Sequence, residues 1–208
     1  MMPRMSRDEL GEIIDKRLPQ LGMEITPDAR WKIVILARGL PMYVHRLGKL
    51  SALRAVRDLR AKISEGDVDA SIEEMMQSSL RSLRDQYDEA TISNQPGNLF
   101  KEVLLACALA KSDDNGYFVP ASVRDPLSKI LRRPMAIAQY QSHLALFHSQ
   151  PRGSILQRIG EERSFRFRFR EPAMQPYVLM KGIASGMVNE EAKAILRFPA
   201  QGELFSDE

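Results

Sequence analysis

The stretch Ser164-Phe165-Arg166-Phe167-Arg168-Phe169-Arg170 alternates aromatic and basic residues without a break. Such a period of two is typical of a β-strand with one face buried and the other in water. The three phenylalanines are therefore expected to face a core, because each aromatic side chain can bury a large apolar area. The arginines then form a row on the opposite face, roughly 7 Å apart given a rise of about 3.4 Å per residue. Such a row suggests a polyanionic partner.

The segments before this strand predict a winged helix-turn-helix domain at residues 98–190. An apolar helix begins at Leu99, a short extended piece covers residues 117–119, and further helices begin at Pro120 and after Pro134. A segment at residues 155–159, a turn containing Gly160 and the Phe/Arg strand predict a β-hairpin. A last helix from about Gln175 follows, and residues 191–208 are expected to be a flexible tail.

The first 92 residues predict a bundle of four helices with short loops. Ser6 and Glu9 form a capping box at the start of the first helix, and Thr26-Pro27 combines an N-cap with proline at the first helical position. The third helix begins at Pro41, and the fourth is expected to run from Asp67 to Tyr87. Residues 91–97 have the composition of a linker, which places the expected domain boundary there. The predicted fold is therefore mainly α.

Charge is distributed unevenly along the chain, which has 208 residues and a net charge of +3. Residues 124–170 hold ten basic and three acidic side chains, so the rest of the chain is net acidic. A basic block on an otherwise acidic chain favours a polyanion such as duplex DNA as the partner. The residues expected to contact DNA are Arg132, Arg133, Gln139, Ser142, His143, Arg163, Arg166, Arg168 and Arg170.

These residues divide into two chemical classes. The helix near residues 135–149 occupies the recognition position and offers amide, hydroxyl and imidazole groups for base edges, but no arginine or lysine. The arginines before it and on the wing suit phosphates. The sequence thus predicts weakly specific binding dominated by the DNA backbone. The alternative is a winged helix that serves protein docking or oligomerisation.

The turn Ala37-Arg38-Gly39-Leu40-Pro41-Met42-Tyr43-Val44-His45-Arg46-Leu47 resembles the lid of AAA+ ATPases. Together with the winged-helix pattern, the chain resembles the C-terminal portion of the origin-recognition initiator family and related bacterial ATPases. The resemblance implies a partner, either an AAA+ nucleotide-binding module or neighbouring subunits. It also implies a nucleotide-sensing arginine at the position of Met42, for which Arg46 or Arg38 would substitute.

The chain lacks the phosphate-binding loop of such ATPases. Its one Gly-Lys pair, Gly48-Lys49, is followed by Leu50, and Tyr43 stands where the first glycine of a P-loop belongs. No apolar strand ends in paired acids that could hold magnesium. The chain is therefore not expected to be an enzyme, and ATP with Mg²⁺ is implied only for a separate nucleotide-binding module.

Other functional classes find little support in the sequence. The three histidines and the single Cys107 lack the spacing of a metal site, so no metal is expected. One cysteine permits no intrachain disulfide, and no apolar segment reaches the length of a membrane span. The expectation is a soluble, cytoplasmic protein with no membrane partner.

Overall fold

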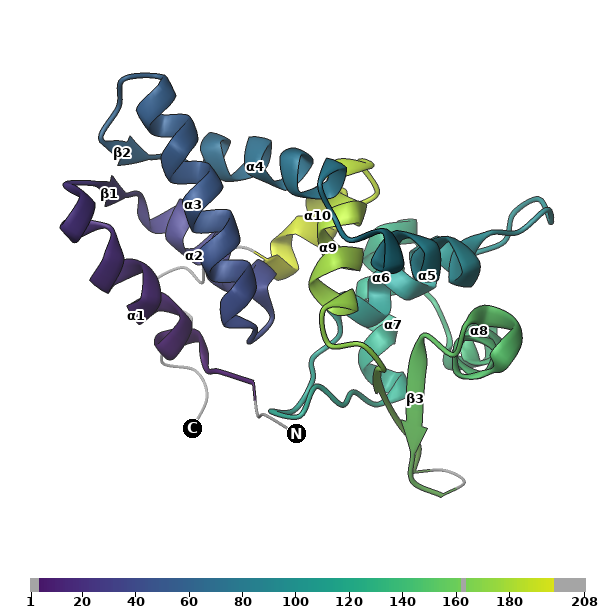
Figure 1. Ribbon diagram of the computed structural model, residues 1–208. Coiled ribbons are helices and arrows are strands. Elements are labelled where there is room, and N and C mark those ends of the chain that lie inside the picture. The colour runs from purple at the N-terminus through teal and green to yellow at the C-terminus, as the bar shows by residue number, and fades with distance from the viewer. Residues whose placement is uncertain (1–3, 162–163, 197–208) are drawn as a thin grey trace. The chain divides into compact units, whose positions relative to one another are not determined.

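The computed structural model describes residues 4–161 and 164–196 (Figure 1). The chain divides into two compact units, with the division inside helix α4 (Glu65–Gln77). The bundle unit comprises Met5–Glu73 together with the segment that begins at Lys193, and the hairpin unit comprises Arg4 and Glu74–Ala192. The boundary expected at residues 91–97 stays a prediction.

Helices of the bundle unit begin where the sequence places their caps. Ser6 accepts a hydrogen bond from the amide of Glu9, whose carboxylate accepts one from the amide of Ser6, so the predicted capping box is confirmed. Thr26 caps the second helix by accepting from the amide of Ala29. The elements are α1 (Arg7–Arg17), η1 (Pro19–Leu21), β1 (Glu24–Ile25), α2 (Pro27–Ala37), α3 (Pro41–Arg57) and β2 (Lys62–Ile63).

Strands β1 and β2 pair in parallel and were not predicted. Glu24 lies opposite Lys62 and Ile25 opposite Ile63, with Ile63 fully buried. Two-residue strands are too short to produce a periodic pattern, so only the folded chain reveals the pairing.

The single helix expected from Asp67 to Tyr87 is wrong, because it is two helices, α4 and α5 (Arg81–Thr91). Two serines mark the break: the hydroxyls of Ser78 and Ser79 donate to the carbonyls of Glu74 and Met76 in the last turn of α4. Serine hydroxyls can replace backbone partners in this way and so help to end a helix. Asp67 is the third residue of α4 rather than its cap, and its carboxylate accepts from the Ser64 amide before the helix.

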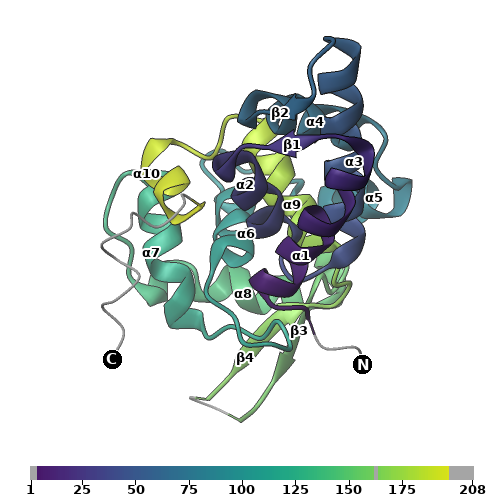
Figure 2. The same cartoon turned by 90° about the vertical axis from the view of Figure 1, so that its left-hand side faces the viewer.

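The hairpin unit has the helix and hairpin order of a winged helix, and the mainly helical fold class is confirmed. Figure 2 shows its two longer strands side by side, projecting from the helices of this unit. Its elements are α5, α6 (Phe100–Leu109), α7 (Pro120–Leu131), η2 (Ile137–Gln139), α8 (Gln141–His148), η3 (Gln150–Arg152), β3 (Leu156–Ile159), β4 (Arg166–Phe169), α9 (Met174–Ala184) and α10 (Glu190–Lys193).

Helix α6 is the centre of the hairpin unit, since nearly all its side chains are buried. Cys107 lies fully buried in this helix, and burial raises the pKa of its thiol, which suits a core residue rather than a nucleophile. Helix α5 packs on the same core, where the Tyr87 ring meets the Tyr177 ring edge-on at 5.9 Å.

Arg152 joins the end of α5 to α6. Its guanidinium lies 3.8 Å from the centre of the Phe100 ring. It donates hydrogen bonds to the carbonyl of Ala90, in the last turn of α5, and to that of Ile92, the residue after the helix. A cation at a helix C-terminus also complements the helix dipole. One side chain thus holds the start of the predicted linker against the hairpin unit.

Part of the predicted flexible tail is helical. Residues 191–196 lie in α10 and in the 3-10 turn η4 (Ala194–Leu196), with Ala192 fully buried. The rest of the predicted tail, from residue 197, lies outside the described residues. None of the helices in the described ranges is long and apolar enough to span a membrane.

Candidate nucleic-acid interface

Strands β3 and β4 form the predicted hairpin, and their register sets which side chains share a face. Arg158 lies opposite Phe167 and Gln157 opposite Arg168. Phe167 and Phe169 are 4% and 2% exposed, so the prediction that these aromatics face a core is confirmed. A backbone bridge from Phe118 to Phe167 adds a third extended segment to the hairpin.

Phe165 departs from the predicted pattern. It is only half-buried, because it precedes the first paired residue of β4 and so lies beyond the edge of the core. The guanidinium of Arg158 lies 4.3 Å from the centre of its ring. An aromatic ring and an arginine thus stack near the hairpin tip, a combination suited to phosphates and bases alike.

A groove of about 870 Å³ lies between α8, the start of α7 and the hairpin. Among the residues that the structure describes, Arg158 and Arg166 are its charged lining residues, and none of the lining residues is acidic. Gln141 and Ala145 contribute from α8. The described residues that line it are Val119, Pro120, Ala121, Ile137, Gln141, Leu144, Ala145, Arg158, Ser164, Phe165, Arg166 and Phe167.

Two arginines of β4 also make contacts within the chain. Arg166 lies 3.4 Å from the Asp113 carboxylate and 5.7 Å from the centre of the Tyr117 ring. Arg168 donates to Gln157 Oε1 at 2.9 and 2.7 Å and lies 4.6 Å from the same ring. Asp113 also accepts hydrogen bonds from the amides of Asn115 and Tyr117, so this acidic segment forms a turn.

Two more arginines complete this surface. Burial lowers the pKa of Arg4, and the nearby charge of Arg168 lowers it further, whereas Asp113 opposes both effects. Arg170 donates through Nε to the carbonyl of Ser154 at 3.0 Å, although its side chain remains exposed. A guanidinium has five N–H donors, so one such bond leaves donors that can meet a phosphate.

The polar residues expected to read bases lie in different surroundings. Ser142 is exposed on the first turn of α8. Gln139 is exposed in η2, where its side-chain oxygen accepts from the Ala136 amide at 2.7 Å. Neither of these two residues is among those that line the groove, whereas Gln141, which was not among the predicted contacts, is exposed and lines it.

His143 lies away from the groove. Its ring is 5.0 Å from the Phe100 ring, and burial lowers its pKa, with the charge of Arg152 as the second cause. On an α-helix with about 100° between residues, position 143 lies roughly 160° from Gln141. The structure therefore separates this histidine from the groove residues with which the sequence grouped it.

The remaining predicted DNA contacts are arginines in connections. Arg132 and Arg133 are exposed in the turn after α7, where Arg132 adopts a left-handed conformation with φ 52°. Arg163 lies outside the described residues. Arg158 was missing from the predicted contacts, because its position over Phe165 depends on the hairpin register and has no local sequence signal.

The two candidate nucleotide-sensing arginines lie in the bundle unit. Arg38 ends α2 in a left-handed conformation with φ 50°, and Arg46 is half-buried on α3. Their expected role toward a nucleotide stays a prediction.

No family model matches the chain, and no curated protein matches it. Among solved structures, Cdc6p from Pyrobaculum aerophilum is similar at 16% identity and a TM-score of 0.34, over 90% of this chain and 50% of that one. The ORC2 protein from Aeropyrum pernix is similar at 13% identity and a TM-score of 0.33, over 90% of this chain and 48% of that one. The chain thus spans about half the length of each of these structures.

Proposed function

We propose that this chain is the non-catalytic C-terminal part of an AAA+ type ATPase, and that its winged helix binds duplex DNA mainly through backbone contacts. The lid-like turn at residues 37–47 and the winged-helix order of the hairpin unit support the first part. The absence of a P-loop from the sequence supports a non-catalytic role. ATP and Mg²⁺ would belong to a separate nucleotide-binding module, toward which Arg38 or Arg46 would act as sensor.

The groove between α8 and the hairpin is the observation that carries the DNA proposal. Its lining combines Gln141 on the recognition helix with Arg158 and Arg166 on the hairpin, and the described part of the lining contains no carboxylate. Guanidinium groups bind phosphates through several donors at once, whereas an amide can pair with a base edge. The single amide and two guanidiniums favour backbone contacts over base reading.

The test is a DNA-binding titration of the whole chain followed by fluorescence anisotropy. A labelled duplex of about 20 base pairs should bind at low salt, and unrelated sequences should bind with similar affinity. Affinity should fall steeply with salt, because each neutralised phosphate contributes about 0.9 to the slope of log K against log salt. Binding that is absent at low salt, or insensitive to salt, would contradict the proposal.

Protein docking is the second candidate function, and a specific observation favours it. Much of the groove lining is apolar, including the exposed Val119 and the side chains of Leu144 and Ala145. In addition, Arg166 and Arg168 already have partners within the chain. A chain that fails to bind DNA but associates with an AAA+ nucleotide-binding module through this groove would favour docking.

A further inference from the structure

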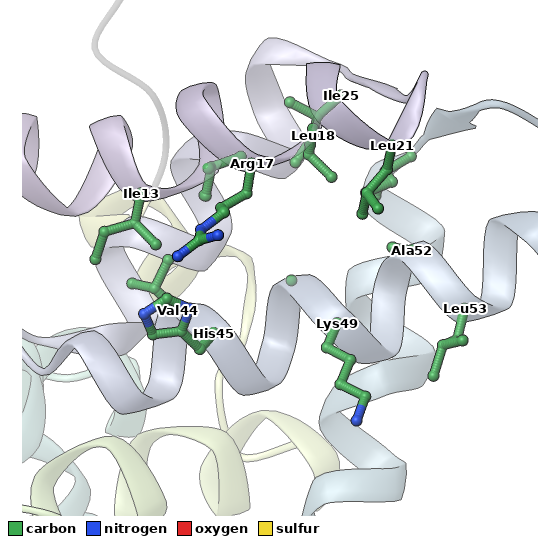
Figure 3. Close-up of a pocket in the computed structure, with 13 residues that line it drawn as sticks. Ile13, Arg17, Leu18, Leu21, Ile25, Val44, His45, Lys49, Ala52 and Leu53 are labelled. Atoms are coloured by element: carbon green, nitrogen blue, oxygen red, sulfur yellow. The ribbon is translucent and has the colours of Figure 1, made fainter.

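A second groove lies in the bundle unit, between α1 and α3, and the winged-helix proposal does not involve it. Its volume is about 250 Å³, and its lining is dominated by aliphatic side chains such as Ile13, Leu18 and Ile63 (Figure 3). Small-molecule pockets usually measure about 300–1,000 Å³. This groove is therefore sized for one or two apolar side chains of a peptide segment.

Gly48 keeps the groove open. It lies in the interior of α3, and a Cβ atom added to it would meet no atom within 4 Å. Glycine in a helix interior makes the helix less stable than alanine would, yet the space that a side chain at position 48 would occupy is empty. The exposed rim is apolar as well, since Leu21 is 68% and Leu53 is 43% exposed. Together these features form a cradle that the described residues leave unfilled.

The two formally charged side chains that line this cradle, Arg17 and Lys49, are both basic. His45 lines it as well, and none of the described lining residues is acidic. Figure 3 shows the Arg17 side chain extending between the two helices toward His45, whereas the Lys49 amine points away from the groove. An apolar cradle with basic side chains beside it matches a segment that has apolar residues between carboxylates.

We propose that Leu204 and Phe205 of this same chain dock in the cradle. They form an adjacent apolar pair in Glu203-Leu204-Phe205-Ser206-Asp207-Glu208, where Glu203 precedes the pair and two further acids follow it. This segment lies outside the described residues, and the described chain ends at Leu196 in the bundle unit. The segment therefore supplies apolar side chains that can fill the cradle and carboxylates that can pair with its basic side chains.

The reach of that segment follows from where the described chain ends and from the number of residues after it. The carbonyl of Leu196 accepts a hydrogen bond from Trp31 Nε1 at 2.9 Å, and the neighbouring Arg30 bonds Asp15 of α1. Eight residues separate Leu196 from Leu204 and can span roughly 26 Å, at about 3.3 Å per residue. That length exceeds the 10–12 Å diameter of α1, around which the segment would pass. A short tether also gives an effective concentration of about millimolar, which favours docking within one chain.

The test is methyl NMR spectroscopy on the full 208-residue chain. Nuclear Overhauser contacts are expected between the Phe205 ring and the methyl groups of Ile13, Ile25 or Leu53. The double variant Leu204→Ser/Phe205→Ser should shift these methyl resonances, because it removes the Phe205 ring and the ring current that shifts nearby methyl groups. Phe198→Ser changes another aromatic of the same segment and is the control, which should leave them in place. Unchanged methyl resonances in the double variant would overturn the proposal.

A second pair of variants blocks the cradle itself. Gly48→Leu places a side chain in the groove, whereas Gly66→Leu adds the same side chain at an exposed helical glycine elsewhere in the unit. Both variants should stay folded, but only Gly48→Leu should abolish the contacts to Phe205. Contacts that persist in Gly48→Leu, or that appear only between differently labelled copies of the chain, would refute docking within one chain.

Discussion

The two arginines that line the hairpin groove give the sharpest test of DNA binding. The perturbation is Arg158→Ala together with Arg166→Ala. Both side chains are exposed, so the double variant should keep its fold, with a loss of less than about 1 kcal/mol from exposed stacking and ion pairing. A thermal melt of the variant checks this expectation.

The structure sets the size of the effect. Among the described residues no carboxylate pairs with Arg158, so its contact with one phosphate should contribute a full increment of about 0.9 to the salt slope. Arg166 lies 3.4 Å from Asp113 and starts partly neutralised, so its increment should be smaller. The double variant should therefore flatten the slope by between about 0.9 and 1.8.

The assay is fluorescence anisotropy with one labelled duplex, repeated between about 50 and 200 mM salt, a range over which DNA affinities change strongly. The matched control is Arg81→Ala with Lys101→Ala, which removes the same charge from exposed positions in the same unit. The control should keep the parent slope apart from a small long-range effect. Equal slopes for the parent, the control and the groove variant would refute the assignment of phosphate contacts to this groove.

Three further predictions concern stability and nucleotide binding. Phe167→Ala should cost about 3–5 kcal/mol in urea unfolding because the ring is buried, whereas Phe165→Ala should cost much less. Asp67→Asn should cost about 2–3 kcal/mol, because the hydrogen bonds from Arg60 hold the pKa of the 4% exposed carboxylate well below its usual range. This contribution should be present above about pH 4 and lost as pH falls below it toward the depressed pKa, so the parent and the variant should converge in acid. Calorimetric titration of the whole chain with ATP should detect no micromolar binding, and stoichiometric binding would contradict the assignment of nucleotide to another module.

Local patterns in the sequence predicted much of the fold. The capping box at Ser6 and the alternation around Phe167 depend on neighbours a few residues apart, so the sequence reveals them directly. The break between α4 and α5 was missed because the hydrophobic period continues through Ser78 and Ser79.

The candidate site was harder to predict, since its contacts join distant parts of the chain. The alternating pattern shows that Arg166 leaves the core, but it cannot show that Asp113, more than fifty residues earlier, lies beside it. Likewise, the place of His143 depends on which side of α8 meets Phe100. Composition therefore predicted the charge of this region but not which of its arginines already contact partners within the chain.

The contacts of Arg152 with the end of α5 determine where this chain can be divided for experiments on its parts. A fragment that starts at residue 98 would lose the carbonyls that Arg152 holds and would uncover the Tyr177 ring where Tyr87 covers it. Loss of the hydrogen bonds of this half-buried arginine destabilises the fragment, and an uncovered aromatic promotes aggregation. A fragment that starts before Arg81 keeps both contacts. Expression of the hairpin unit alone should therefore begin upstream of α5, and any recombination that transfers this unit to another protein would have to carry α5 with it.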